Sequence, residues 1–257
     1  MKNRNAALLP GLTALALSLG LAACGGGGDD AGGSAGPKAE GAYAGTLTGS
    51  ASSAFQLLVL ENDEYWSLYG TTSGNTLLVA GFVQGSGASN NGSFASSNAL
   101  DFGFATPVQG TVSAAYVAGT SIQGSTAAAG QTVTFSGTAI AASTYNYSTP
   151  ALLADIQGSW SLTSLAGAPA SLNVSATGAL TGSSQGCAFS GTITPRPSGK
   201  NVFNVALTFG AAPCLLPGQT AAGIAISNLV AGTARRQLIV VGVNTGRTAG
   251  TALFGTR

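Results

Sequence analysis

The chain has 257 residues, of which 39 are glycine and only 7% are charged. Nine Lys and Arg nearly balance eight Asp and Glu, so no bulk charge indicates a nucleic-acid partner or an anionic membrane surface. The chain has no histidine, which removes the commonest general base and metal ligand. We therefore expect a protein that is not an enzyme and that holds no cofactor or metal.

The N-terminus has the layout of an export signal. Lys2 and Arg4 supply positive charge, and the apolar stretch that follows is short for a permanent membrane anchor. It ends in the run Leu-Ala-Ala-Cys at 21–24, which resembles the lipobox of bacterial lipoproteins. The resemblance implies that a signal peptide, residues 1–23, is removed and that lipid is attached to Cys24.

The same resemblance implies a location. In Gram-negative lipoproteins an Asp just after the lipidated cysteine resembles an inner-membrane retention signal, and here that position is Gly25. We therefore expect a lipid anchor in the outer membrane, with the periplasmic and surface faces both left open. Residues 24–40 are glycine-rich and poor in apolar side chains, which predicts a flexible tether between the lipid and the folded body.

From Gly41 onward the chain alternates between apolar and polar residues. Within 203–209, for example, Phe, Val, Leu and Phe alternate with Asn, Ala and Thr, a period of two that is typical of half-buried strands. Turn residues recur about every eight to twelve residues, which favours antiparallel strands in a sandwich or barrel. The fold class is therefore all-β.

Two similar units are predicted, because Gly41-Ala42-Tyr43 and Gly158-Ser159-Trp160 open the two halves alike. Each is expected to be a small antiparallel β-barrel of about eight strands, or a barrel-like unit. The first covers 41–145 and the second 158–257. A linker, 146–157, carries a short helical turn that Thr149 would cap, with Pro150 at its first position.

Charge is divided unevenly between the halves. Seven acids and one base lie between positions 24 and 150, whereas one acid and six bases follow from position 151 onward. Either the two halves attract each other or present different faces to a partner, or the pattern is drift among sparse solvated charges.

Two cysteines remain once Cys24 is assigned to lipid. Cys187 and Cys214 are an even pair in an exported chain, which predicts a disulfide. A metal or redox pair has little support, because the chain has neither histidine nor a Cys-x-x-Cys motif.

Two family resemblances involve the second unit. Gly158-Ser159-Trp160, after a helical turn, resembles the opening of lipocalins, and this implies a late arginine stacked on Trp160, with Arg247 as the matching position. The segments 187–192 (Cys-Ala-Phe-Ser-Gly-Thr) and 212–214 (Ala-Pro-Cys) resemble two-repeat proteobacterial lipoproteins of unknown activity. That resemblance implies a location and a fold, but no function.

Three further motifs favour structural roles. Gly182-Ser183-Ser184-Gln185-Gly186 matches a Gly-x-Ser-x-Gly elbow, but the chain has no histidine base for it. Glu61, Asp63 and Glu64 fit a solvated hairpin turn better than a cation site or a carboxylate pair. Arg235-Arg236 fits a polar turn between two apolar strands, with an anion grip as the alternative.

The segment 65–69 is the densest aromatic patch. If Trp66 and Leu68 face the core, Tyr65 and Tyr69 lie outside or line a mouth, where they could anchor a partner. Plain cross-strand packing is the alternative.

The composition and motifs predict a non-enzymatic binding or interaction module for an unknown protein or small-molecule ligand. The alternative is a lipocalin-like carrier of a small apolar ligand. The two hypotheses differ in the barrel interior, because a carrier needs an apolar cavity of roughly several hundred Å³.

Overall fold

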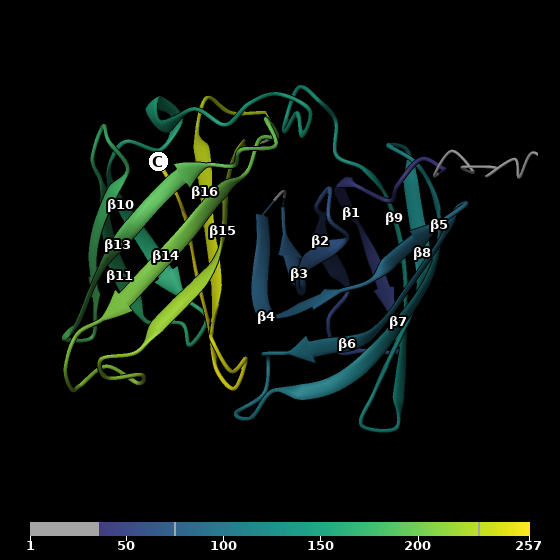
Figure 1. Ribbon diagram of the computed structural model, residues 1–257, viewed down its shortest axis with the longest axis horizontal. Coiled ribbons are helices and arrows are strands. Elements are labelled where there is room, and N and C mark those ends of the chain that lie inside the picture. The colour runs from purple at the N-terminus through teal and green to yellow at the C-terminus, as the bar shows by residue number, and fades with distance from the viewer. Residues whose placement is uncertain (1–35, 75, 231) are drawn as a thin grey trace, which may run out of the picture. The chain divides into compact units, whose positions relative to one another are not determined.

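The computed structural model describes residues 36–74, 76–230 and 232–257, and in them the chain forms two closed antiparallel β-barrels of eight strands each (Figure 1). The predicted all-β fold with two barrels is confirmed. Strand β10 begins at Gly158, and the connection from the end of β9 at Ala139 holds a single 3-10 turn at Leu153–Asp155. The expected cap is wrong: the turn starts after Leu152, and the Thr149 hydroxyl instead donates to the carbonyl of Asn146.

The first barrel has one strand more than its ring requires. Its strands pair in the order β4-β3-β2-β1-β9-β8-β7-β6-β5, and β4 pairs with β6 to close the ring and leave β5 outside it. At the closure, Val83 lies opposite Asp101 and Gln84 opposite Leu100. The strand bounds are β1 Gly41–Thr48, β2 Ala54–Val59, β3 Glu64–Ser73, β4 Thr76–Ser86, β5 Ala88–Asn90, β6 Ser93–Asp101, β7 Val108–Val117, β8 Ser121–Ala128 and β9 Gln131–Ala139.

The second barrel is an up-and-down ring that β10 and β17 close, and its interior is filled by side chains. The inward positions carry large apolar residues, among them Phe189, Phe203 and Leu238, which are almost wholly buried. The strand bounds are β10 Gly158–Ser164, β11 Pro169–Val174, β12 Ala179–Ser184, β13 Cys187–Pro195, β14 Phe203–Phe209, β15 Thr220–Leu229, β16 Arg236–Asn244 and β17 Gly250–Thr256.

The predicted disulfide is confirmed. Cys187 at the start of β13 is bonded to Cys214 in the loop between β14 and β15, with an S–S distance of 2.00 Å. In the chain-entropy model a loop of this length contributes about 3–4 kcal/mol of stability.

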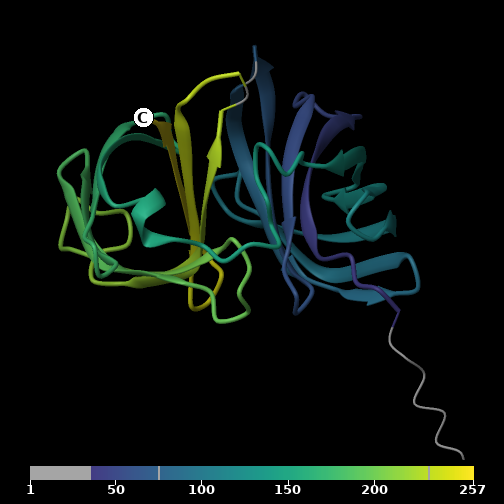
Figure 2. The same ribbon diagram turned by 90° about the horizontal axis from the view of Figure 1, so that it is seen from above.

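The outer faces of the two barrels meet in an apolar layer, here called the interbarrel core. In Figures 1 and 2 the yellow strands β16 and β17 lie beside the blue strands of the first barrel, as the contacts require. Trp66 stacks on Phe82 with ring centroids 6.1 Å apart, and Phe82 stacks on Phe102 at 4.8 Å. The core comprises Ala42, Leu58, Leu60, Trp66, Leu68, Leu77, Phe82, Phe102, Tyr145, Tyr147, Val202, Ile224, Ile239, Val241, Val243 and Ala252.

The position of β16 between the two barrels explains why its sequence is apolar throughout. Leu238 and Val240 face the interior of the second barrel, while Ile239 and Val241 face the first barrel. A strand buried on both faces shows a continuous apolar run instead of alternation, as this segment does.

For β3 the prediction is right that Trp66 and Leu68 are buried, but it is wrong about which face lines the ring. Trp66 and Leu68 point out of their barrel into the interbarrel core, and Tyr65 and Tyr69 point into the barrel. The error has a physical reason, because both faces of β3 are covered. The alternation along the strand separates its residues into two faces, but it does not show which face lines the ring.

Charged side chains join the barrels at their edges. Arg196 Nε lies 2.8 Å from Glu61 Oε1, and Lys200 Nζ lies 3.3 Å from Glu40 Oε1. These are two of the four ion pairs in the described ranges, and in both the acid belongs to the first half and the base to the second. The structure therefore fits the interpretation in which the acidic half and the basic half attract each other.

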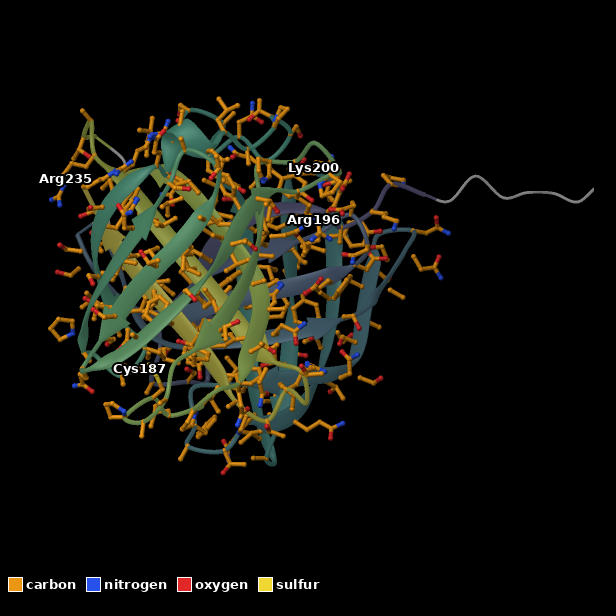
Figure 3. The ribbon with its side chains drawn as sticks, turned by 60° about the vertical axis from the view of Figure 1, so that its left-hand side comes forward. Cys187, Arg196, Lys200 and Arg235 are labelled. Atoms are coloured by element: carbon orange, nitrogen blue, oxygen red, sulfur yellow. A yellow bond between two sulfur atoms is a disulfide. The ribbon has the colours of Figure 1, made fainter. Side chains whose placement is uncertain are left out.

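Arg247 adds a further link between the barrels. Its Nη2 donates to the carbonyl of Gln84 at 2.8 Å and to that of Asn98 at 2.9 Å. In Figure 3, Arg196 and Lys200 lie at the end of the second barrel opposite to Cys187.

We expect Trp66→Ala to lower the free energy of unfolding by about 3–5 kcal/mol, because it leaves a void against Phe82 in the interbarrel core. The matched control is Leu78→Ala on neighbouring β4, where the side chain is 52% exposed and the cost should be roughly 0.5 kcal/mol or less. Urea unfolding of both variants measures the difference, and equal losses would contradict the assignment of Trp66 to a buried interface.

The Glu61–Arg196 pair predicts a pH-dependent stability. Burial alone would raise the pKa of Glu61, but the hydrogen bonds from its own backbone N–H and from Arg196, together with the charge of Arg196, lower that pKa below its usual value. Because folding lowers this pKa, the ionised Glu61 carboxylate stabilises the fold at pH values above the unfolded-state pKa, which is about 4.3 for Glu. That contribution is lost as pH falls through the folded-state pKa.

Glu61→Gln should therefore cost about 0.5–1 kcal/mol at pH near 7 and nothing once the wild-type carboxyl is protonated. Unfolding curves over a pH series measure this. The control is Glu64→Gln, whose carboxylate accepts bonds from Trp66 and Gln84 of the first barrel instead of from Arg196. A cost of Glu61→Gln that persists unchanged in acid would refute the ion-pair explanation.

Candidate functional site

The first barrel encloses a cavity of about 370 Å³. Its walls come from inward residues of all eight strands of the ring, and its open end lies at the turns after β1, β6 and β8. Phe104, which is 58% exposed, lies at this open end in the segment between β6 and β7. The wall residues are Leu47, Phe55, Leu57, Val59, Tyr65, Ser67, Tyr69, Val83, Phe94, Asp101, Val112, Ile122, Thr126, Val133 and Phe135.

Small side chains lie among the aromatic residues on the inward face of this barrel, and part of the interior stays unfilled. Ser67 lies between Tyr65 and Tyr69 on the inward face of β3, and Val112 and Thr126 take inward positions on β7 and β8. In the second barrel the interior holds one buried cluster that includes Trp160, Phe189, Phe203 and Leu238.

A polar pair interrupts the apolar wall. The Tyr69 hydroxyl donates to Asp101 Oδ1 at 2.6 Å, and the Gly103 N–H donates to the same oxygen at 2.8 Å. Burial raises the pKa of the Asp101 carboxyl, while these two hydrogen bonds act in the opposite direction. Burial, and then the hydrogen bond to Asp101 and its charge, raises the pKa of Tyr69.

Two glycines hold the Tyr69 hydroxyl in place. A Cβ atom on Gly81 or on Gly103 would collide with Tyr69 Oη, so both positions must lack a side chain for the hydroxyl to reach Asp101. Tyr69 also sits at the irregularity in the pairing of β3 with β4, next to the place where β4 meets β6. The closure of the barrel and the polar pair therefore occupy the same region.

The other end of the first barrel is covered by the segment just before β1. Ala39 is fully buried, its N–H donates to Ser89 Oγ at 3.0 Å, and its carbonyl accepts from Tyr43 Oη at 3.0 Å. The Tyr116 hydroxyl donates to the carbonyl of Pro37 at 2.8 Å. Residues 37–40, expected in the tether, thus pack on the barrel, because Ala39 fills a buried site. Cys24 and the tether up to residue 35 lie outside the described residues.

The arginine expected on Trp160 is a different one. The Arg257 guanidinium lies 4.0 Å from the Trp160 ring centroid, and Trp160 Nε1 donates to the carbonyl of Ile156 at 2.7 Å. The choice of Arg247 is wrong because that residue lies in the turn between β16 and β17, at the opposite end of the barrel. Backbone hydrogen bonds between Arg257 and Arg236 place the last residue beside the start of β10. The sequence alone did not reveal this register.

The acidic cluster is the predicted hairpin turn between β2 and β3, although its acids are paired instead of merely solvated. Glu61 binds Arg196, Asp63 Oδ1 accepts from Ser89 Oγ at 2.6 Å, and Glu64 Oε1 accepts from Trp66 Nε1 at 2.9 Å. Within 36–74, 76–230 and 232–257, no group of three or more His, Cys, Asp or Glu side chains could hold a metal ion.

The remaining two motifs lie in hairpins. Ser183, on β12, shares a hydrogen bond with the Ser171 hydroxyl at 3.0 Å, and a strand follows the motif where an elbow needs a helix. Arg235 lies in the turn after β15, and Arg236 opens β16 with Nη2 3.0 Å from Asp155 Oδ1. The predicted polar turn is therefore present.

Over the part of the chain that the structure covers, no helix is both long and apolar enough to cross a membrane. No protein-family model, no curated protein and no solved structure matches this chain.

Proposed function

We propose that this chain is a non-enzymatic binding protein whose first barrel takes up a small apolar ligand. The observation that carries the proposal is the cavity of about 370 Å³. Small-molecule sites have volumes of roughly 300–1,000 Å³ and combine an apolar wall with a few polar groups. The wall of this cavity has that composition, with Tyr69, Asp101 and Ser67 among its polar members.

The contrast between the barrels favours a carrier over a module that interacts only through its surface. The second barrel is filled by its own side chains and packs against the outside of the first. Tyr65 and Tyr69, the residues expected to anchor a protein partner, face the cavity instead of the solvent. The aromatic patch therefore supports ligand binding within the barrel.

We further propose that the protein is held at the outer membrane of a Gram-negative cell through lipid on Cys24, with the face left open. The lipobox-like run at 21–24 and Gly25 support this proposal. The Cys187–Cys214 bond supports export as well, because disulfides persist in oxidising compartments such as the periplasm.

A cavity-filling substitution tests the binding proposal. Ser67→Phe should weaken binding of the neutral fluorescent probe N-phenylnaphthylamine by about tenfold or more, because the added ring occupies the space of the ligand. The matched control is Ser113→Phe on β7, where the side chain is exposed, and binding should be unchanged. Absence of probe binding to the wild-type protein, or equal binding by both variants, would reject the cavity as the site.

The anchor is tested on the full chain expressed in a Gram-negative host. Mass spectrometry should find an acylated N-terminal peptide that begins at Cys24, and Cys24→Ser should abolish both the acylation and the recovery of the protein with membranes. An intact, unmodified N-terminus in the cytosol would overturn the proposal.

A further inference from the structure

Among the residues that the structure describes, the wall of the first-barrel cavity carries a single acid and no base. Asp101 is the one carboxyl among these lining residues, none of them is Lys or Arg, and the chain has no His. A charge in an apolar enclosure is costly unless it meets a partner of opposite charge or several hydrogen bonds. An anionic amphiphile in this cavity would add a second negative charge near the first, with nothing opposite to either.

Both hydrogen bonds to the Asp101 carboxyl are accepted by the same oxygen. Tyr69 and Gly103 both donate to Oδ1, and among the described residues no donor reaches Oδ2. Because the Tyr69 hydroxyl and the Gly103 N–H both bind Oδ1, the carboxyl is oriented before any ligand arrives. A preorganised acceptor in a partly dry site favours a ligand that donates a charge-assisted hydrogen bond.

Resting on the ligand-binding function proposed above, we propose that the ligand is an apolar molecule bearing a protonated amine, which the Asp101 carboxylate binds at the rim of the cavity. The apolar body lies deeper, against Leu57, Phe94 and Ile122, and Phe104 covers part of the opening. The cavity accordingly selects amines over alcohols of the same length and rejects carboxylates.

The test is a displacement series on the full chain with N-phenylnaphthylamine as the reporter. The competitors are decylamine, decanol and decanoate, which share one alkyl chain and differ in charge, each used below its micelle-forming concentration. For the wild-type protein at pH near 7, decylamine should bind about tenfold tighter than decanol, and decanoate should bind most weakly.

Asp101→Asn removes the charge while its side-chain oxygen can still accept from Tyr69 and Gly103. In this variant decylamine should lose its advantage and bind no tighter than decanol. Asp155→Asn, which removes the same charge beside the second barrel, is the matched control and should keep the full preference for decylamine.

A pH series adds a readout that does not depend on a variant. Burial raises the pKa of Asp101, so the affinity for decylamine should fall as pH is lowered through that pKa, while the affinity for decanol stays constant. The other titratable groups at the cavity are Tyr65 and Tyr69, both with raised pKa values. The base that contacts β6 is Arg247, from the turn between β16 and β17, which donates to the Asn98 carbonyl. Neither neighbouring strand, β4 or β7, carries an acid or a base.

The outcomes separate the two proposals. If the wild-type protein does not bind the reporter, the binding function itself fails. If it binds the reporter but decanol competes as well as decylamine, the function stands and the amine inference is overturned. If the Asp101→Asn variant unfolds and no longer binds the reporter, the amine inference is tested by the competitor series and its pH dependence on the wild-type protein.

Discussion

Burial of apolar side chains on the outside of both barrels is the constraint on which the rest of the structure depends. The outward residues of β3 and β4 include Trp66 and Phe82, and those of β16 include Ile239 and Val241. Contiguous apolar surface of this kind is rarely left in contact with water. Each barrel therefore needs the other, and the ion pairs Glu61–Arg196 and Glu40–Lys200 fix which edges meet.

This arrangement also explains how the first barrel can remain hollow. A cavity forfeits the contacts that its lining would otherwise make, and the loss grows with its volume. Here the strands β2, β3 and β4 are supported from outside by the interbarrel core, so their stability does not depend on a filled interior. The second barrel, which its own side chains fill and which the Cys187–Cys214 bond cross-links, acts as the rigid support.

Much of the fold could be predicted from local patterns, because strand periodicity and turn residues are local properties. The disulfide followed from counting cysteines, and the turns at Glu61–Asp63 and Arg235 followed from charge between apolar runs. The facing of Trp66 could not be predicted, since both sides of its strand are covered and only the pairing of the two barrels distinguishes them. The partner of Trp160 depended on the register of the last strand, which brings Arg257 to it.

The candidate site was missed for a related reason. Asp101 stands alone at a strand end, and its partner Tyr69 lies 32 residues earlier, so no motif connects them. Only the pairing of β4 with β6 brings the two together. A lone acid just before Phe102-Gly103 in an otherwise uncharged segment was the signal available.

The glycines at 81 and 103 have a consequence for how such a protein can diversify. They contribute no atom to the binding wall, yet a single methyl group at either one would push the tyrosine hydroxyl away from its acid. Substitutions at these two backbone positions near the rim would thus change the ligand preference in descendants of this chain without changing the interbarrel core.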